Sequence, residues 1–210
     1  MNDAFARALD LIRTNDHGQA LSLLKSIAPV PEERAAEIVF YKGWCLELLG
    51  SENGAEAVAY YRQAAMLRGN VETQINSWFR AGWVEQSRRE FAAAEGCFAH
   101  AAACAVAHRL RNSTYHHARF WQAVCRENIG RYLDARAQYA EVADEASDLR
   151  MECRYREIMC SIAVGDFAAA LASCEGVGAL DPDELSPREN ELKVLVAKEE
   201  ALLRRILAAS

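Results

Sequence analysis

The stretch Val164–Leu171, VGDFAAAL, joins a glycine-containing turn to the start of an alanine-rich helix. Glycine adopts left-handed backbone at little cost, and alanine is the strongest helix former. Gly165 stands five residues before Ala170, and Phe167 stands three residues before it. If this spacing recurs at a fixed period, the chain is an array of helical hairpins.

The spacing recurs five times, with successive alanine anchors 37, 37, 41 and 35 residues apart. A residue that is usually larger follows each anchor by four positions, and an apolar residue follows three later. The five sets are Ala20–Leu24–Ile27, Ala57–Tyr61–Ala64, Ala94–Phe98–Ala101, Ala135–Tyr139–Val142 and Ala170–Cys174–Val177. Steps of four and three lie on one helix face, so each anchor set predicts the buried face of a helix.

A first helix precedes each turn. Seven residues before the glycine position is a position, here called the small position, whose side chain usually allows helices to approach closely. It holds Ala8, Gly43, Gly82 and Ala123, and in the last hairpin the larger Ile158. Gly50, Gly130 and Gly165 fit the turn itself, with Asn15 and Arg89 in the glycine's place elsewhere. Each unit is therefore a two-helix hairpin that must stack on its neighbours to bury its apolar face. All prolines lie at 29, 31, 182 and 187, which favours an all-α chain.

The pattern resembles the tetratricopeptide repeat family. The resemblance rests on Trp78, Ala81 and Gly82 with Phe91, Ala94, Phe98 and Ala101, and on Gly165-Asp166-Phe167 with Ala170 and Leu180-Asp181-Pro182. Lys42, Gln122 and Glu157 depart from it, because the family usually has leucine there. It implies a right-handed superhelical α-α solenoid over residues 1–182, with units at about 3–30, 36–68, 74–109, 115–147 and 150–180.

Residues 186–210 form a separate helical segment. Ser186, Pro187 and Glu189 supply the hydroxyl, the first-turn proline and the acid of a capping box. The apolar stripe that follows predicts a helix that caps the last hairpin. The alternative is a dimerisation helix with contacts through Leu192, Leu195 and Leu202.

Two rows of side chains on the first helices share one face. Three residues before the small position stand Phe5, Phe40, Phe79, Phe120 and Tyr155, and one residue after it stand Leu9, Trp44, Trp83, Val124 and Met159. In the family that this chain resembles, that face lines a concave groove where peptides bind. The implied ligand-binding residues are Phe40, Trp44, Asn76, Phe79, Trp83, His117, Phe120, Val124, Glu127, Tyr155 and Met159. The alternative is that the aromatic row packs into the core between hairpins.

The expected function is therefore a non-catalytic adaptor or scaffold that binds a protein or peptide with apolar anchors. The alternative is a structural protein that self-assembles into homodimers through its C-terminal helix or groove. A net charge of −6 with dispersed Lys and Arg argues against nucleic acid and anionic membranes as partners. No secretory signal or membrane-spanning run is visible, and seven cysteines without a disulfide pattern indicate a reducing cytoplasm.

One set of side chains raises the remote alternative of a metal- or thiol-dependent enzyme. Cys97, His100, Cys104 and His108 follow one another at steps of three or four on one helix face. One straight helix cannot wrap a tetrahedral zinc ion with all four, since its turns are about 5.4 Å apart. We expect no cofactor, no metal and no enzymatic activity.

Overall fold

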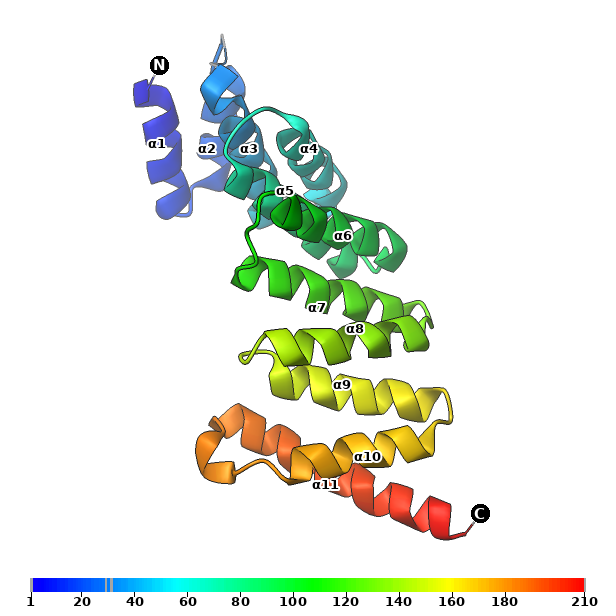
Figure 1. Cartoon of the computed structure of the whole chain (residues 1–210). Helices are drawn as coiled ribbons and strands as arrows, with labels where there is room; N and C mark the ends of the chain where they lie inside the picture. Colours follow the sequence, from blue (N-terminus) through cyan, green and yellow to red (C-terminus); the bar gives the residue numbers. More distant parts are fainter. Residues whose placement is uncertain (1, 29, 31, 210) are drawn as a thin grey trace. The chain divides into compact units, whose positions relative to one another are not determined.

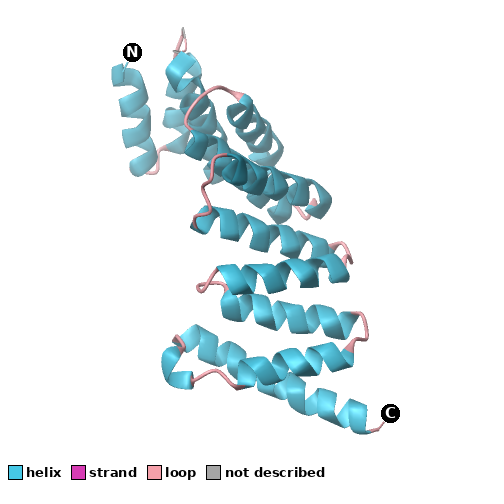
Figure 2. Ribbon diagram, viewed as in Figure 1, coloured by secondary structure: helices cyan, strands magenta, loops and turns pink. Residues whose placement is uncertain are grey.

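A computed structural model describes residues 2–28, 30 and 32–209. Within these residues the chain is all-α, without strands (Figures 1 and 2). The helices are α1 (Asn2–Arg13), α2 (His17–Ser26), α3 (Ala35–Leu49), α4 (Gly54–Met66), α5 (Val71–Ser87), α6 (Phe91–Ala107), α7 (Ser113–Asn128), α8 (Tyr132–Glu145), α9 (Arg150–Ala163), α10 (Phe167–Gly178) and α11 (Pro187–Ala208). Short 3₁₀ turns occupy Glu32–Arg34, Ser51–Asn53 and Pro182–Glu184.

The chain forms two compact units, residues 1–118 and 119–210, which divide within α7. Within the first unit each of the helices α1 to α6 contacts the next in the sequence, and α3 also contacts α5. Within the second unit each of the helices α8 to α11 contacts the next, and α9 also contacts the C-terminal helix α11. Helical hairpins stacked in this way form a repeat array, as the sequence predicts.

The anchors form the core of every hairpin. All five anchor alanines are fully buried, and so are the residues four positions on: Leu24, Tyr61, Phe98, Tyr139 and Cys174. The small position permits close packing, because a Cβ added at Gly82 would lie 2.9 Å from the Phe98 ring. These predictions are confirmed.

The turn inside each hairpin has left-handed backbone at the predicted position. Positive φ values occur at Asn15 (63°), Gly50 (137°), Arg89 (64°), Gly130 (79°) and Gly165 (77°). In four of these turns the next amide donates to a carbonyl five residues back, as Asp16 N donates to Leu11 O at 2.8 Å and Glu90 N to Glu85 O at 2.9 Å. This bond satisfies a carbonyl at the end of the first helix, and the same bond closes the hairpin whether glycine is present or not.

Candidate functional site

Two pockets in the first unit share three of their lining residues, Phe40, Trp44 and Asn76. The first, of about 300 Å³, lies between α1, α3 and α5 and is also lined by Phe5, Leu9, Arg34, Glu37, Tyr41 and Thr73. The second, of about 370 Å³, lies between α3, α5 and the start of α7 and is also lined by Phe79, Arg80, Ser113, Thr114 and His117. Because they share a wall, we name the two pockets together the aromatic groove.

Ring contacts fix the shared wall of the aromatic groove. Phe40 meets Tyr41 edge to face at 5.4 Å between ring centroids, and it meets Trp44 in the same way at 5.8 Å. Tyr41 and Trp44 stack at 5.6 Å with an interplanar angle of 9°. All three rings are half-buried. Each contact restrains its neighbour, so a rigid apolar surface is already formed before any partner arrives.

The cations at the rim of the groove are paired with carboxylates. Arg34 lies 5.4 Å from the ring centre of Phe5 and 3.5 Å from a carboxylate oxygen of Glu37. Arg80 lies 5.2 Å from the ring centre of Trp44 and donates to Glu47 at 3.1 Å. The groove therefore presents apolar rings inside a rim with balanced charge. This arrangement suits an apolar side chain better than a highly charged one.

One hydroxyl and one amide add hydrogen-bonding capacity to this surface. Burial, and next the charge of Glu37, raise the pKa of Tyr41, so its hydroxyl remains a donor at neutral pH. Asn76 is exposed where the two pockets meet, and its amide can both donate and accept.

Comparison with known proteins bears on the fold alone. No protein-family model matches the chain, and none of the curated proteins matches it either. Among solved structures, the chain is similar to a Podospora anserina putative kinesin light chain with nearly identical TPR-like repeats. The TM-score is 0.60 and the identity 13%, over 83% of this chain and 91% of that one. It is also similar to a MamA RS-1 double mutant, with a TM-score of 0.63 and 14% identity over 98% and 96% of the two chains.

The fold is a TPR-like repeat array. At 13–14% identity, these similarities concern the fold and leave the chemistry of each surface to the residues themselves.

The structure gathers five of the predicted groove residues in the first unit of the array. Phe40, Trp44, Asn76, Phe79 and His117 all line the aromatic groove. A ligand-binding role for these five residues stays a prediction.

Trp83 lies elsewhere. Its side chain is 37% exposed and lines a separate pocket of about 210 Å³ beside the turn of the second hairpin, with Gly50, Ser51 and Ser87. It is one helical turn beyond Phe79, which moves it along α5 towards the turn end of the hairpins. The expectation that Trp83 lines the same groove as Phe79 is corrected.

In the second unit the predicted wall turns inwards. Phe120 and Val124 are only 5% and 4% exposed and belong to the core cluster with Tyr139. The guanidinium of Arg156, from the next hairpin, lies over the Phe120 ring at 5.7 Å from its centre. The prediction that Phe120 and Val124 line an open groove is therefore wrong. For Phe120 the alternative interpretation is correct: this aromatic side chain packs into the core.

The other predicted residues of this unit have structural neighbours. Tyr155 is half-buried against the cluster that contains Ile158, and Met159 is half-buried. Glu127 accepts hydrogen bonds from Tyr139 and Arg156. A ligand-binding role for these three residues stays a prediction.

Two half-buried polar triads are absent from the sequence-based predictions. Each joins a tyrosine of a second helix, a glutamate of its own first helix and an arginine of the next hairpin: Tyr61–Glu47–Arg80 and Tyr139–Glu127–Arg156. The Tyr139 hydroxyl donates to Glu127 at 2.8 Å, and Arg156 donates to the same carboxylate at 3.1 Å. Burial raises the pKa of Tyr139, so its hydroxyl stays protonated and its hydrogen bond to Glu127 persists. The triads tie consecutive hairpins together.

The proposed metal-binding side chains do not converge. Cys97 is buried beside Arg62, and His100 stacks on Trp78 at 4.6 Å between ring centroids. Cys104 Sγ lies 4.0 Å from His108 Nδ1. Over the described part of the chain, no three or more His, Cys, Asp or Glu side chains are grouped to hold a metal ion. Burial also raises the pKa of the Cys45 and Cys174 thiols to about 11, which disfavours the nucleophilic thiolate.

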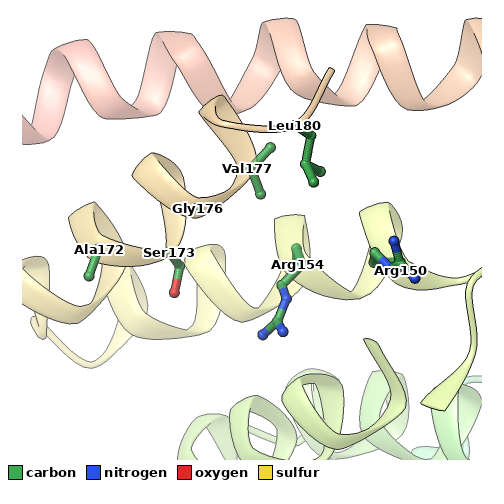
Figure 3. A pocket seen from close by; sticks show the side chains of 7 residues that line it. All are labelled: Arg150, Arg154, Ala172, Ser173, Gly176, Val177 and Leu180. Atoms are coloured by element: carbon green, nitrogen blue, oxygen red, sulfur yellow. The ribbon is translucent and has the colours of Figure 1, made fainter. Parts of the chain in front are cut away.

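A third pocket, of about 450 Å³, lies between α9 and α10 in the second unit (Figure 3). Arg150 and Arg154 on α9 face Ser173 and Gly176 on α10. Arg154 is held between Asp144 at 2.6 Å and Glu157 at 2.7 Å, and Ser173 donates to the same Glu157. Since two carboxylates neutralise Arg154, this pocket offers little net charge to an anion.

None of the described helices is both long and apolar enough to cross a membrane.

Proposed function

We propose that the chain is a non-catalytic interaction scaffold whose aromatic groove binds a peptide or a partner helix through apolar side chains. The observation that carries the proposal is the sharing of Phe40, Trp44 and Asn76 by two pockets. Repeat arrays of this fold commonly present such surfaces to other proteins, which is support by analogy. All seven cysteines are free thiols, in keeping with our proposal that the scaffold works in the reducing cytoplasm.

The two pockets set the chemistry of the partner. Each accepts one apolar or aromatic side chain, and each side chain that becomes fully buried contributes about 1.5–3 kcal/mol before ordering costs. Asn76 stands between them, where its amide can pair with a peptide bond of the guest. Two such anchors sum to about 3–6 kcal/mol before the cost of ordering the guest, so on their own they support a dissociation constant no tighter than about 40 µM.

The test uses peptides selected from a random displayed library on the immobilised wild-type chain. Their affinities are then measured in solution by fluorescence anisotropy. Asn76→Trp fills the wall shared by both pockets, and because Asn76 is exposed the variant should fold normally. We expect at least a tenfold loss of affinity, about 1.4 kcal/mol.

Trp83→Ala is the control, because Trp83 lies in the same helix as Asn76, α5, but lines a separate pocket. It should leave peptide affinity unchanged. Selected peptides that bind Asn76→Trp as tightly as the wild type, with the fold intact by circular dichroism, would refute the assignment of the groove.

A second candidate function is self-association through α11. Self-association through α11 requires exposed apolar side chains, and Leu195 and Leu202 are 37% and 52% exposed. Leu192 is 3% exposed and packs against the chain's own core, so it is unavailable to a partner and that part of the expectation is corrected.

A further inference from the structure

One flank of α11, beside the face that packs into its own unit, carries two leucines seven residues apart. Leu192, Val196 and Leu203 point inwards to the cluster of α9 and α10. Leu195 and Leu202 lie at the edge of that buried face and are exposed. Seven residues make almost two full turns, so the two leucines lie one above the other along the helix.

Three charged residues run beside these leucines with the same spacing: Glu191, Lys198 and Arg205. We name them, together with Leu195 and Leu202, the α11 seam. Glu191 pairs with Arg188 at 3.1 Å, but both side chains are about two-thirds exposed, so that pair is weak. In the described residues no carboxylate lies within ion-pair distance of Lys198 or Arg205. The seam is therefore acidic at its N-terminal end and basic at its centre and C-terminal end.

We infer that the α11 seam binds the α11 seam of a second copy of the chain in antiparallel orientation. In an antiparallel pair with twofold symmetry, the same flank of each helix faces its copy with the order reversed. Leu195 then lies opposite Leu202 of the other copy, and Glu191 lies opposite Arg205. Both contacts occur twice. The inference rests on the self-association proposed above and adds its orientation and register.

The charge order favours this orientation over the parallel one. A parallel pair would place each residue level with its own copy, so Glu191 would meet Glu191 and Arg205 would meet Arg205. The antiparallel pair replaces these like-charge contacts with two opposite-charge contacts. Only Lys198, at the centre, meets its own copy, and this contact opposes the pairing.

The interface is small, because one helix of 22 residues carries it. A single pair of helices buries less than the roughly 1,200 Å² of a standard stable complex, so the dimer should be weak and depend on concentration. We expect a dissociation constant in the range of about 10–500 µM.

Sedimentation velocity on the full chain, from about 1 µM to about 1 mM, measures this equilibrium directly. Leu195→Gln with Leu202→Gln should raise the dissociation constant at least tenfold. Leu207→Gln is the matched control, since Leu207 is an exposed leucine on the opposite flank of the same helix, and it should leave the dissociation constant unchanged. Lys198→Leu should lower the dissociation constant, because it removes the central repulsion.

Charge exchange tests the register. Glu191→Arg alone and Arg205→Glu alone should each weaken the dimer several-fold, and the double variant should restore wild-type affinity. A wild-type chain that stays monomeric throughout the range would overturn both the self-association and its register. A dimer that the leucine variants disrupt, but that the double charge exchange fails to restore, would overturn the antiparallel register while self-association stands.

Discussion

Gly82→Ala tests the close helix approach on which each hairpin depends. The added Cβ would lie 2.9 Å from two carbon atoms of the Phe98 ring and 3.0 Å from a third. Carbon atoms prefer separations of about 3.5–4.0 Å, so each contact is short by about 0.5 Å or more. Phe98 is fully buried and cannot move aside, and overpacking of this kind costs about 1–3 kcal/mol. Alanine also stabilises a helix interior by about 1 kcal/mol relative to glycine, which partly offsets that cost.

Gly96→Ala separates these two effects. Gly96 lies in α6, the partner helix, and a Cβ added there meets no atom within 4 Å. It should therefore show the helix gain alone, and the two variants should differ by about 1–3 kcal/mol in the free energy of unfolding. Urea unfolding followed by circular dichroism measures both. In a Phe98→Leu background the cost of Gly82→Ala should shrink, as a coupled pair requires. Equal stability of the two single variants would refute the argument for close approach.

Three further predictions concern the polar network, acid stability and the thiols. Tyr139→Phe removes the hydroxyl that is hydrogen-bonded to Glu127 and should lower the free energy of unfolding by about 1 kcal/mol. Tyr132→Phe, in the same helix, should change it little. If urea unfolding shows the same loss of stability for both variants, the triad is contradicted. The pKa of Asp166 lies below its ordinary 3.8 because Arg136, and next the Ala169 amide, donate to it, and the pKa of Glu189 lies below 4.5 because Ser186 donates to it. Such groups stabilise the fold fully above the unfolded pKa and lose that contribution as the pH falls through the folded pKa. Stability should therefore decline below about pH 4, and Asp166→Asn with Glu189→Gln should flatten the decline in acid titrations followed by circular dichroism. With iodoacetamide at neutral pH, half-buried Cys104 should be alkylated first. Burial raises the pKa of four other thiols to about 11 or 12, so these should react far more slowly: Cys45, Cys153, Cys160 and Cys174. Equal alkylation rates by mass spectrometry would contradict the burial of these four thiols.

The fold followed from the sequence because one local pattern fixed it repeatedly. Anchor alanines at a nearly constant period have a single physical explanation, a buried helix face repeated in every hairpin. Even the turn positions without glycine were identified by spacing alone, since Asn15 and Arg89 adopt the left-handed backbone found at Gly130 and Gly165. Local chemistry would have argued against Arg89 there, and its place in the repeat was the stronger guide.

The sequence predicted which side chains line a pocket only where the exposure of a side chain is determined by its position on its own helix. Phe40 and Phe120 occupy the same position in their hairpins, yet one lines the groove and the other is core. Arg156, thirty-six positions away, lies over the Phe120 ring, whereas Arg80 at the corresponding position lies over Trp44 and not over Phe40. No pattern within one hairpin carries that information.

The polar triads did leave a signal in the sequence. Tyrosine stands four residues after the anchor, and glutamate stands four residues after the small position, in the second and fourth hairpins. Arginine stands two residues before the small position of the next hairpin. Aligning these three positions between hairpins would have found both triads, whereas reading the apolar rows alone could not.

The closing turns of the hairpins bear on how this scaffold can be engineered. Four of them span three residues, 14–16, 88–90, 129–131 and 164–166, while the connections between hairpins range from the four residues 67–70 to the eight residues 27–34. The length of the turn inside a hairpin is therefore nearly constant, whereas the length of the connection between hairpins can change. Reporter peptides, affinity tags or whole domains should therefore be grafted into segments such as 67–70 or 108–112, where an added loop costs little.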